Sequence, residues 1–168
     1  MEGTLKEEEK HAEISSLTSH EGKYLTFVLD NEEYGIEILK VREIIGVMTI
    51  TPVPQSPNYV KGVINLRGKV IPVIDLRLKF GFPEKEYTKE TCIIVVEVSN
   101  SLTGIIVDTV SEVLDIAAQD MEPSPHFGEG IDTDVFIGIA KIKNKVKILL
   151  DIDKVLHLEE FSITHNLT

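Results

Sequence analysis

The sequence predicts an all-β protein with a few short helical turns, arranged as two similar β lobes that pack face to face. From Lys23 onward, short apolar segments rich in Val, Ile and Thr are interrupted by Gly, Pro, Asn and Asp, a pattern typical of β-sandwiches and barrels. An internal repeat relates the two halves of the chain. The 168 residues, 42% of them hydrophobic, suffice to bury a core without disulfides.

Four β-hairpins account for most of the predicted strands. Each consists of two apolar segments separated by a short polar turn, and Gly68 can take the positive φ that a tight turn requires. The hairpins are Tyr24–Leu29 with Glu33–Ile38 around Asp30–Glu32, Gly62–Leu66 with Val70–Leu76 around Arg67–Lys69, Thr91–Val98 with Thr103–Val107 around Ser99–Ser101, and Phe136–Ile142 with Val146–Asp151 around Lys143–Lys145.

The segments between the hairpins are less regular. Val41–Ile50 combines helical spacing at its start with β-branched residues at its end, which predicts one helical turn followed by a strand. Three prolines then interrupt regular pairing and predict a loop up to Asn58, because proline lacks the amide donor of a central strand. Near the end of the chain, Asp153 is suited to cap a short helix over Lys154–Glu160.

The internal repeat supports two lobes. GIEILKVREII at 35–45 aligns with GIIVDTVSEVL at 104–114, with identity at four of eleven positions. GVINLRGKVIPVIDL at 62–76 aligns with GIAKIKNKVKILLDI at 138–152, which places a basic residue, Arg67 or Lys143, at the same point of each. Two packed lobes explain the repeat, since either alone is too small to bury its apolar strand faces. The alternative is that hairpins resemble one another by composition.

Charge and composition limit the classes of partner. The net charge of -11 disfavours nucleic acid and anionic membrane surfaces. The single cysteine, Cys92, excludes an internal disulfide and a thiolate zinc cluster and suggests the cytoplasm. No apolar run approaches the roughly 18–20 residues that span a bilayer. Residues 1–22 carry many charges and few large apolar side chains, so we expect a flexible tail, and deletion of Met1–His20 should cost no thermal stability.

No catalytic set, metal site or cofactor motif is recognisable. The five histidines lack the spacing that would bring two imidazoles to one metal, and His126 is interpreted as a loop residue. Cys92 begins an apolar strand and is expected to be inert, and Gly128–Gly130 lacks the strand–loop–helix context of a phosphate site. Asp75, Asp108, Asp151 and Asp153 lie near strand ends, where turn and cap roles are more common than acid–base pairs. A binding module is therefore expected rather than an enzyme.

Five ordered blocks carry a family resemblance. They are YGI at 34–36, KVREI at 40–44, PNYVKGVINLRG at 57–68, PVIDL at 72–76 and GIIVD at 104–108, and KGVINLRG is the most specific of them. With these blocks the chain resembles the CheW family of chemotaxis coupling proteins from about Lys23 to Leu158.

The resemblance implies a fold and a function. It implies two small five-stranded, SH3-like or OB-like β-barrel lobes around a shared hydrophobic seam, possibly interleaved in sequence, within a domain over 23–158 and before a C-terminal tail over 159–168. It implies no enzymatic activity and no cofactor. Members of the family bridge the cytoplasmic tip of methyl-accepting chemotaxis receptors to the regulatory domain of the histidine kinase CheA, in receptor arrays at the inner face of the membrane.

The resemblance also implies a receptor-binding groove between the lobes. The motifs place along it Ile38, Val41, Glu43, Gly62, Asn65 and Arg67. Apolar side chains would supply contact area to a helical hairpin, and Gly62 would let two backbones approach closely. The Arg67 guanidinium offers five donors in a planar fork, and Glu43 could hold it in place. No residues are assigned to the kinase contact.

Two alternatives stay open. A paralogous scaffold of another receptor-kinase system, such as type IV pilus control, would keep the fold and change the partner. A β-barrel nucleic-acid binder would need stacked aromatics over a basic groove, which the ten Phe and Tyr residues and the acidic charge do not favour.

Overall fold

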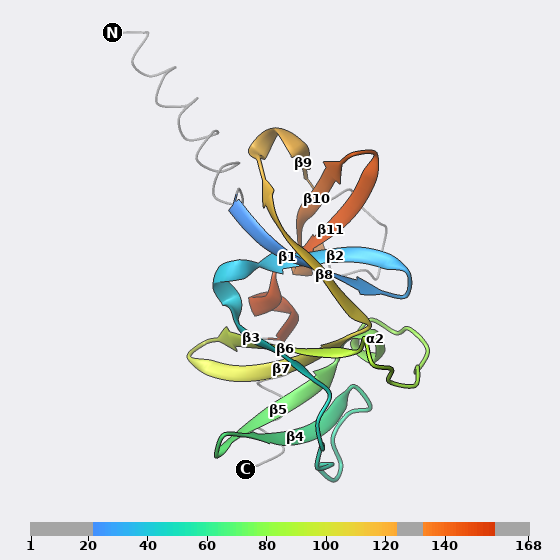
Figure 1. The fold of residues 1–168 in the computed structure, drawn as a ribbon, viewed down its shortest axis with the longest axis vertical. Coiled ribbons are helices and arrows are strands. Elements are labelled where there is room, and N and C mark those ends of the chain that lie inside the picture. Colours follow the sequence, from blue (N-terminus) through green and yellow to red (C-terminus); the bar gives the residue numbers. More distant parts are fainter. Residues whose placement is uncertain (1–21, 124–132, 157–168) are drawn as a thin grey trace, which may run out of the picture.

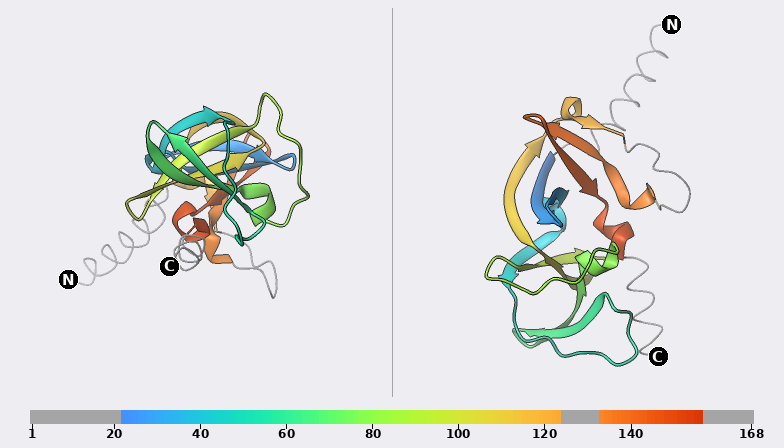
Figure 2. Two further views of the ribbon diagram at one scale, coloured as in Figure 1. Left: turned by 90° about the horizontal axis from the view of Figure 1, so that it is seen from below. Right: turned by 90° about the vertical axis from the view of Figure 1, so that its right-hand side faces the viewer.

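Two curved β-sheets, stacked one above the other, form the protein (Figures 1 and 2). This architecture comes from a computed structural model, which describes residues 22–123 and 133–156. It confirms the predicted all-β class, with helices limited to short turns. None of the helical segments within these residues could span a bilayer. The tails predicted over 1–22 and 159–168, the loop with His126 and Gly128–Gly130, and the end of the closing helix lie wholly or almost wholly outside the described residues.

We call the six-stranded sheet lobe A. Its strand order is β8-β1-β2-β11-β10-β9. The sixth strand, β9, is only two residues long, and the other five match the number expected for each lobe. The bounds are β1 (Gly22–Leu29), β2 (Glu32–Glu37), β8 (Thr109–Ile116), β9 (Met121–Glu122), β10 (Phe136–Ile142) and β11 (Lys145–Leu150).

We call the five-stranded sheet lobe B. Its strand order is β3-β6-β7-β5-β4. The bounds are β3 (Val41–Gly46), β4 (Val60–Leu66), β5 (Lys69–Asp75), β6 (Cys92–Val98) and β7 (Ser101–Val107). The helical turns are η1 (Ile38–Lys40), α2 (Leu76–Lys79), η2 (Ala118–Asp120), η3 (Thr133–Val135) and a helical segment over 152–156.

The two lobes are interleaved along the chain. The hairpin β1–β2 belongs to lobe A, but the chain then crosses through η1 and continues as β3 in lobe B. It returns at Asp108, where β7 of lobe B is followed by β8 of lobe A. Each lobe therefore combines the first hairpin of one sequence half with the remaining strands of the other half.

The internal repeat corresponds to a structural repeat. The central strands of lobe A, in the order β1-β2-β11-β10, correspond one by one to the strands β6-β7-β5-β4 of lobe B. Both lobes contain one parallel pair at the same place, β2 with β11 and β7 with β5, among otherwise antiparallel neighbours. Composition alone would not reproduce this order, so the resemblance between the halves reflects a duplicated unit.

All four predicted hairpins are present, but their turns are shorter than expected. The pairs that close them, such as Leu29 with Glu32 and Leu66 with Lys69, leave two residues in each turn instead of three. Both turn residues have positive φ in every case, as in type I′ turns, whose twist matches that of the flanking strands. The turns are Asp30–Asn31, Arg67–Gly68, Ser99–Asn100 and Lys143–Asn144.

Two further predictions were wrong in position. A helical turn followed by a strand does occur, but the turn precedes Val41 and the strand ends at Gly46, so the β-prone residues 47–50 lie outside it. The closing helix begins at 152, and Asp151 rather than Asp153 caps it, since its Oδ1 accepts the Lys154 N–H at 3.3 Å. Asp75 caps α2 in the same way, at the corresponding point of the other half.

The largest hydrophobic cluster lies between the lobes rather than inside either of them. It joins lobe A residues such as Phe27 and Ile36 to lobe B residues such as Ile94 and Val96, all of them fully buried. The interiors of the individual lobes form smaller clusters. The shared hydrophobic seam is thus confirmed, and apolar burial across it is the main force holding the lobes together.

Lobe A contains a nearly buried ion pair. Lys147 is 3% exposed and its Nζ lies 2.7 Å from Glu33 Oε2 on the neighbouring strand. Leu149, two residues along the same strand, belongs to the interior cluster of this lobe. The aligned positions of lobe B hold Ile71 and Leu102, so the repeat shows an apolar alternative to this pair.

Replacing the pair with the residues of lobe B tests its contribution. We expect Glu33→Leu alone to destabilise the fold by about 3 kcal/mol, because it leaves the buried Lys147 ammonium unpaired. The double variant Glu33→Leu, Lys147→Ile should recover that loss and match or exceed the wild type. Urea unfolding measures all three proteins. A double variant no more stable than the single one would show that the pair contributes net stability.

Candidate partner-binding site

Four of the six predicted site residues, Glu43, Gly62, Asn65 and Arg67, lie around the point where lobe B closes on itself. β3 and β4 lie at opposite edges of the sheet, yet the chain after β3 turns back so that Thr51 pairs with Val63 of β4. Backbone hydrogen bonds of 2.8 and 2.9 Å join these two residues. The sheet of lobe B thereby closes into a barrel. Lobe A closes similarly, through β9 pairing with β10.

Gly62 permits this closure. A Cβ atom on Gly62 would lie 2.0 Å from the Thr51 carbonyl oxygen, and the residue has a φ of +141°. Gly138, its counterpart in lobe A, lies against Glu122 in the same way, since a Cβ atom there would lie 2.6 Å from the Glu122 carbonyl oxygen. The close backbone approach expected at Gly62 is therefore made within the chain, which explains why both repeats carry glycine here.

Arg67 and Glu43 form an ion pair across the closed barrel. The two guanidinium Nη atoms reach the two carboxylate oxygens, one of them at 3.3 Å. The hydrogen bond to Glu43 raises the pKa of Arg67 above its already high ordinary value. The arginine side chain is 72% exposed and remains accessible to a partner. The contact expected between these residues is confirmed.

Arg67 occupies an unfavourable backbone conformation. Its φ is +53°, in the left-handed region where an ordinary L-residue costs about 1–2 kcal/mol relative to the right-handed region and Gly or Asn costs less. Asn65 supports the same turn, because its Oδ1 accepts the Gly68 N–H at 2.8 Å. The turn itself does not require arginine. The presence of arginine at position 67 therefore points to a role for its side chain.

Ile38 and Val41 lie at a different part of the surface, along the edge of the seam. Both are half-buried and pack against the inter-lobe cluster. A bulge between Val41 and Glu43 shifts the register of β3, which pairs Val41 with Val96 of the seam and Glu43 with Val95 of the lobe B interior. The structure thus divides the six predicted residues into a seam-edge pair and a group at the barrel closure.

Exposed aliphatic side chains continue from the seam edge. Leu39 is 80% exposed between Ile38 and Val41, and Ile44, Val47 and Met48 follow along β3 and beyond it, each at least one-third exposed. Exposed apolar residues that cluster along one segment commonly mark a docking surface. We call the side chains of Ile38, Leu39, Val41, Ile44, Val47 and Met48 the apolar ridge.

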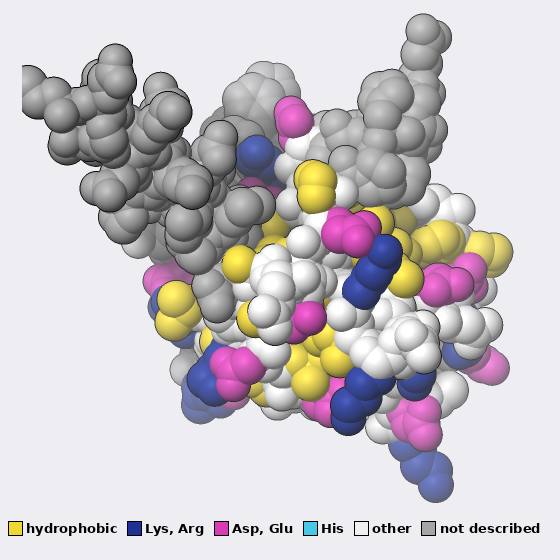
Figure 3. Space-filling model, turned by 90° about the horizontal axis from the view of Figure 1, so that it is seen from above, with side chains coloured by type: hydrophobic (Ala, Val, Ile, Leu, Met, Phe, Trp, Pro, Cys, Tyr) yellow, Lys and Arg dark blue, Asp and Glu magenta, His cyan; other side chains and the backbone are white. Residues whose placement is uncertain are grey.

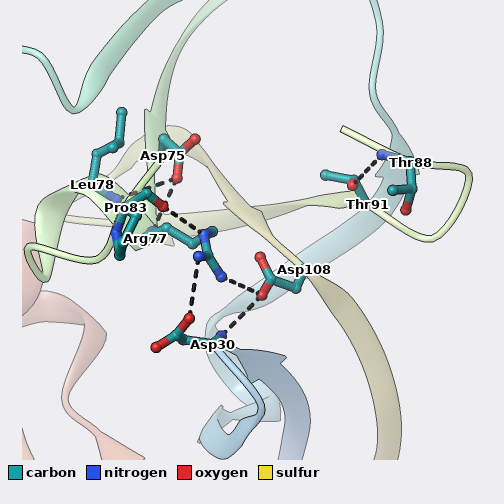
Figure 4. A network of polar contacts seen from close by, with 8 residues as sticks. All are labelled: Asp30, Asp75, Arg77, Leu78, Pro83, Thr88, Thr91 and Asp108. Atoms are coloured by element: carbon teal, nitrogen blue, oxygen red, sulfur yellow. Dashed lines mark hydrogen bonds and ion pairs between the residues drawn. The ribbon is translucent and has the colours of Figure 1, made fainter. Parts of the chain in front are cut away.

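The sequence interpretation missed two ion-pair sites at the crossovers. Lys40 Nζ lies 2.8 Å from Asp153 Oδ2, and this hydrogen bond raises the pKa of Lys40. At the other crossover, Arg77 reaches Asp108 and Asp30 (Figure 4). The sequence offered only two weak signals for these sites: Arg77 after the capping Asp75, and Lys40 at the point where the chain crosses to lobe B. No spacing rule relates such residues to partners that are far away in sequence.

The strand-end carboxylates show cap and ion-pair contacts. Asp75 accepts the backbone N–H groups of Arg77 and Leu78, and its other oxygen accepts the Tyr87 hydroxyl at 3.1 Å. Burial and this carboxylate raise the pKa of Tyr87. The Cys92 thiol donates to the Glu90 carbonyl at 3.2 Å. Within residues 22–123 and 133–156, no three His, Cys, Asp or Glu side chains are grouped to hold a metal ion.

Charges on the lobe A end of the molecule are mixed. Figure 3 shows Lys and Arg side chains beside Asp and Glu over this face, with hydrophobic side chains between them. Lys141 with Glu122 and Lys23 with Asp115 are paired in this lobe. A nucleic-acid site needs a continuous basic surface, which the visible face does not provide.

Comparisons with known proteins identify one family. The sequence model of the CheW-like domain matches residues 23–160. Chemotaxis protein CheW from Klebsiella aerogenes is 41% identical over 144 residues, which cover 86% of this chain and 87% of the relative. Its namesake from Bacillus subtilis is 39% identical over 140 residues, covering 82% and 88%. The crystal structure of scaffolding protein TtCheW from Thermoanaerobacter tengcongensis matches with a TM-score of 0.74 at 39% identity, covering 81% and 92%.

Proposed function

The chain belongs to the CheW-like family, and from that premise we propose that it is a non-enzymatic chemotaxis scaffold that couples receptors to the histidine kinase CheA. The observation that carries the proposal is the match of the whole two-lobed domain, since the relatives are chemotaxis proteins and a scaffolding protein over nearly their full lengths. A scaffold requires binding surfaces rather than a reaction centre.

The receptor tip docks on the apolar ridge and the adjacent Arg67. Ile38 and Val41 supply the half-buried floor, and Leu39 supplies an exposed side chain that a helical hairpin can cover. Arg67, oriented by Glu43, directs its remaining donors at carbonyl or carboxylate oxygens of the partner. Asn65 and Gly62 act by shaping the turn and the barrel closure beneath the arginine.

The kinase regulatory domain binds elsewhere on the lobes, through residues that are not assigned. The scaffold transmits a signal only if it binds two receptor-kinase states with different affinity, because equal affinity shifts no equilibrium. Association with receptors places it in arrays at the inner face of the membrane.

Titration calorimetry of the full chain with an isolated receptor tip and, separately, with the kinase regulatory domain tests the proposal. We expect saturable binding in both cases, with a negative heat-capacity change from apolar burial. Leu39→Asp should weaken receptor binding by about tenfold or more, since it places a charge in the apolar contact. Val146→Asp is the matched control, because Val146 is 51% exposed on lobe A, away from the ridge.

Three outcomes would contradict the proposal. Flat titrations with folded partners would favour the paralogous scaffold of another receptor-kinase system. Salt-sensitive binding to an oligonucleotide would favour the nucleic-acid alternative. Equal effects of the two Asp variants would place the receptor site away from the apolar ridge.

A further inference from the structure

Arg77 lies at the centre of an ionic cluster between the lobes, in which the Arg77 and Asp108 side chains are largely buried and Asp30 is 46% exposed (Figure 4). The Arg77 side chain is 9% exposed, and its Nη atoms lie 2.7 Å from Asp108 Oδ2 and 3.2 Å from Asp30 Oδ1. The Nε–H donates to the Pro83 carbonyl at 3.1 Å. Asp108 Oδ2 also accepts the Asp30 N–H at 2.9 Å. We call Arg77, Asp30 and Asp108 the inter-lobe clamp.

The three members of the clamp come from three different parts of the fold. Asp30 is in the β1–β2 turn of lobe A, and Arg77 is in α2, which follows β5 of lobe B. Asp108 is the single residue between β7 and β8, where the chain passes from one lobe to the other, and its N–H donates to the Val28 carbonyl of lobe A at 3.1 Å. The clamp therefore links both lobes to the crossover between them.

The other crossover also carries an ion pair, with the charges of the two partners reversed. Lys40, at the end of η1, pairs with Asp153 of the helical segment over 152–156 that corresponds to α2. This pair is more exposed than the Arg77–Asp108 pair, at 34% and 45% of the two side chains against 9% and 12%, so water screens it more strongly. Of the two crossovers, the one at Asp108 has the more directional and more desolvated contact.

Apolar burial holds the lobes together but does not by itself select one alignment of their surfaces, since it is non-directional. Hydrogen-bonded ionic groups depend strongly on distance and angle, and replacing a buried pair by uncharged groups often leaves stability nearly unchanged. We infer that Arg77 is a positioning residue: the clamp sets the register of lobe A against lobe B and so sets where η1, which follows β2 of lobe A and carries Ile38 and Leu39, lies relative to Arg67 at the barrel closure of lobe B. This inference rests on the proposed receptor function.

The double variant Arg77→Met, Asp108→Asn tests the inference. It removes the cation and the buried carboxylate together, while the asparagine side chain introduced at position 108 still offers an oxygen to the Asp30 N–H. We expect the thermal midpoint to stay within a few degrees of wild type. Affinity for the receptor tip should fall about tenfold, as it would if the binding-competent register dropped to about one tenth of the population.

Lobe register is measured without any partner. Spin labels at positions 70 and 146 report the distance between the lobes, since Val70 and Val146 are exposed, correspond in the repeat and belong to different lobes. Cys92→Ser removes the single native thiol. We expect a narrow distance distribution in the wild type and a broader one in the double variant. Lys141→Met with Glu122→Gln is the control, because it removes an exposed pair within lobe A and should change neither the distances nor the affinity.

The outcomes separate the inference from the proposed function. An unchanged distance distribution with wild-type receptor affinity would overturn the positioning role. A fall of many degrees in the thermal midpoint, with affinity lost only in proportion to the unfolded fraction, would also overturn it by showing a purely structural role. If the wild-type protein did not bind the receptor tip at all, the proposed function would fail, and the spin-label distances would still decide whether the clamp sets the register.

Discussion

Gly62→Ala is expected to destabilise lobe B by about 3 kcal/mol or more. The new methyl group would overlap the Thr51 carbonyl, from which a Cβ lies only 2.0 Å away, and the φ of +141° adds backbone strain for a residue other than glycine. Relief requires the Thr51–Val63 pairing to open, which would release the closure of the barrel. Urea unfolding of the variant measures the loss.

Gly46→Ala is the matched control. Gly46 ends β3 in the same lobe, but a Cβ there meets nothing within 4 Å and its φ is not positive. Its cost should stay within about 1 kcal/mol. Gly138→Ala should also destabilise the fold, but less, because the Glu122 carbonyl would lie 2.6 Å from the new Cβ and the φ of Gly138 is not positive. If Gly62→Ala and Gly46→Ala unfolded at the same urea concentration, the approach of Thr51 would not be what fixes glycine at position 62.

Arg67→Ala is expected to keep the fold and to lower affinity for the receptor tip by tenfold or more. The side chain is largely exposed, and exposed ion pairs contribute only about 0–1 kcal/mol to stability. Alanine adopts the same backbone conformation at a similar cost, so the turn should persist. Loss of the guanidinium would remove the donors proposed to contact the partner, and arginine is among the residues whose removal most often costs about 2 kcal/mol or more in an interface.

Lys143→Ala is the control for Arg67→Ala. Lys143 occupies the same position of the same two-residue turn in lobe A, with a φ of +52° against +53° for Arg67. It should leave receptor binding unchanged. Calorimetry measures the affinity of each variant for the receptor tip, and thermal unfolding shows whether each variant is folded. Wild-type affinity in Arg67→Ala, or an unfolded variant, would remove Arg67 from the binding surface.

Local patterns in the sequence were enough to determine the class, the four hairpins and the duplication. Strand segments are recognisable because short apolar runs bounded by polar turns are local features of a few residues, as in Tyr24–Leu29 and Cys92–Val98, each of which has four consecutive buried residues. The contact of Arg67 with Glu43 was also predictable, although only through the family resemblance. The predicted turns were one residue too long. Both residues of a two-residue type I′ turn need positive φ, and Arg67 and Lys143 are not residue types that indicate it.

Only the tertiary structure decided which strands share a lobe. The chain crosses between lobes after β2 and again after β7, and these crossings depend on how the two halves bury their apolar faces against each other. Apolar burial is non-directional, so the sequence alone does not indicate which faces pack together. The same crossing brings Arg77 to Asp30 and Asp108, which lie 47 and 31 residues away. Local sequence patterns therefore specified the repeated unit. Long-range packing specified how two such units exchange strands and which charged residues meet between them.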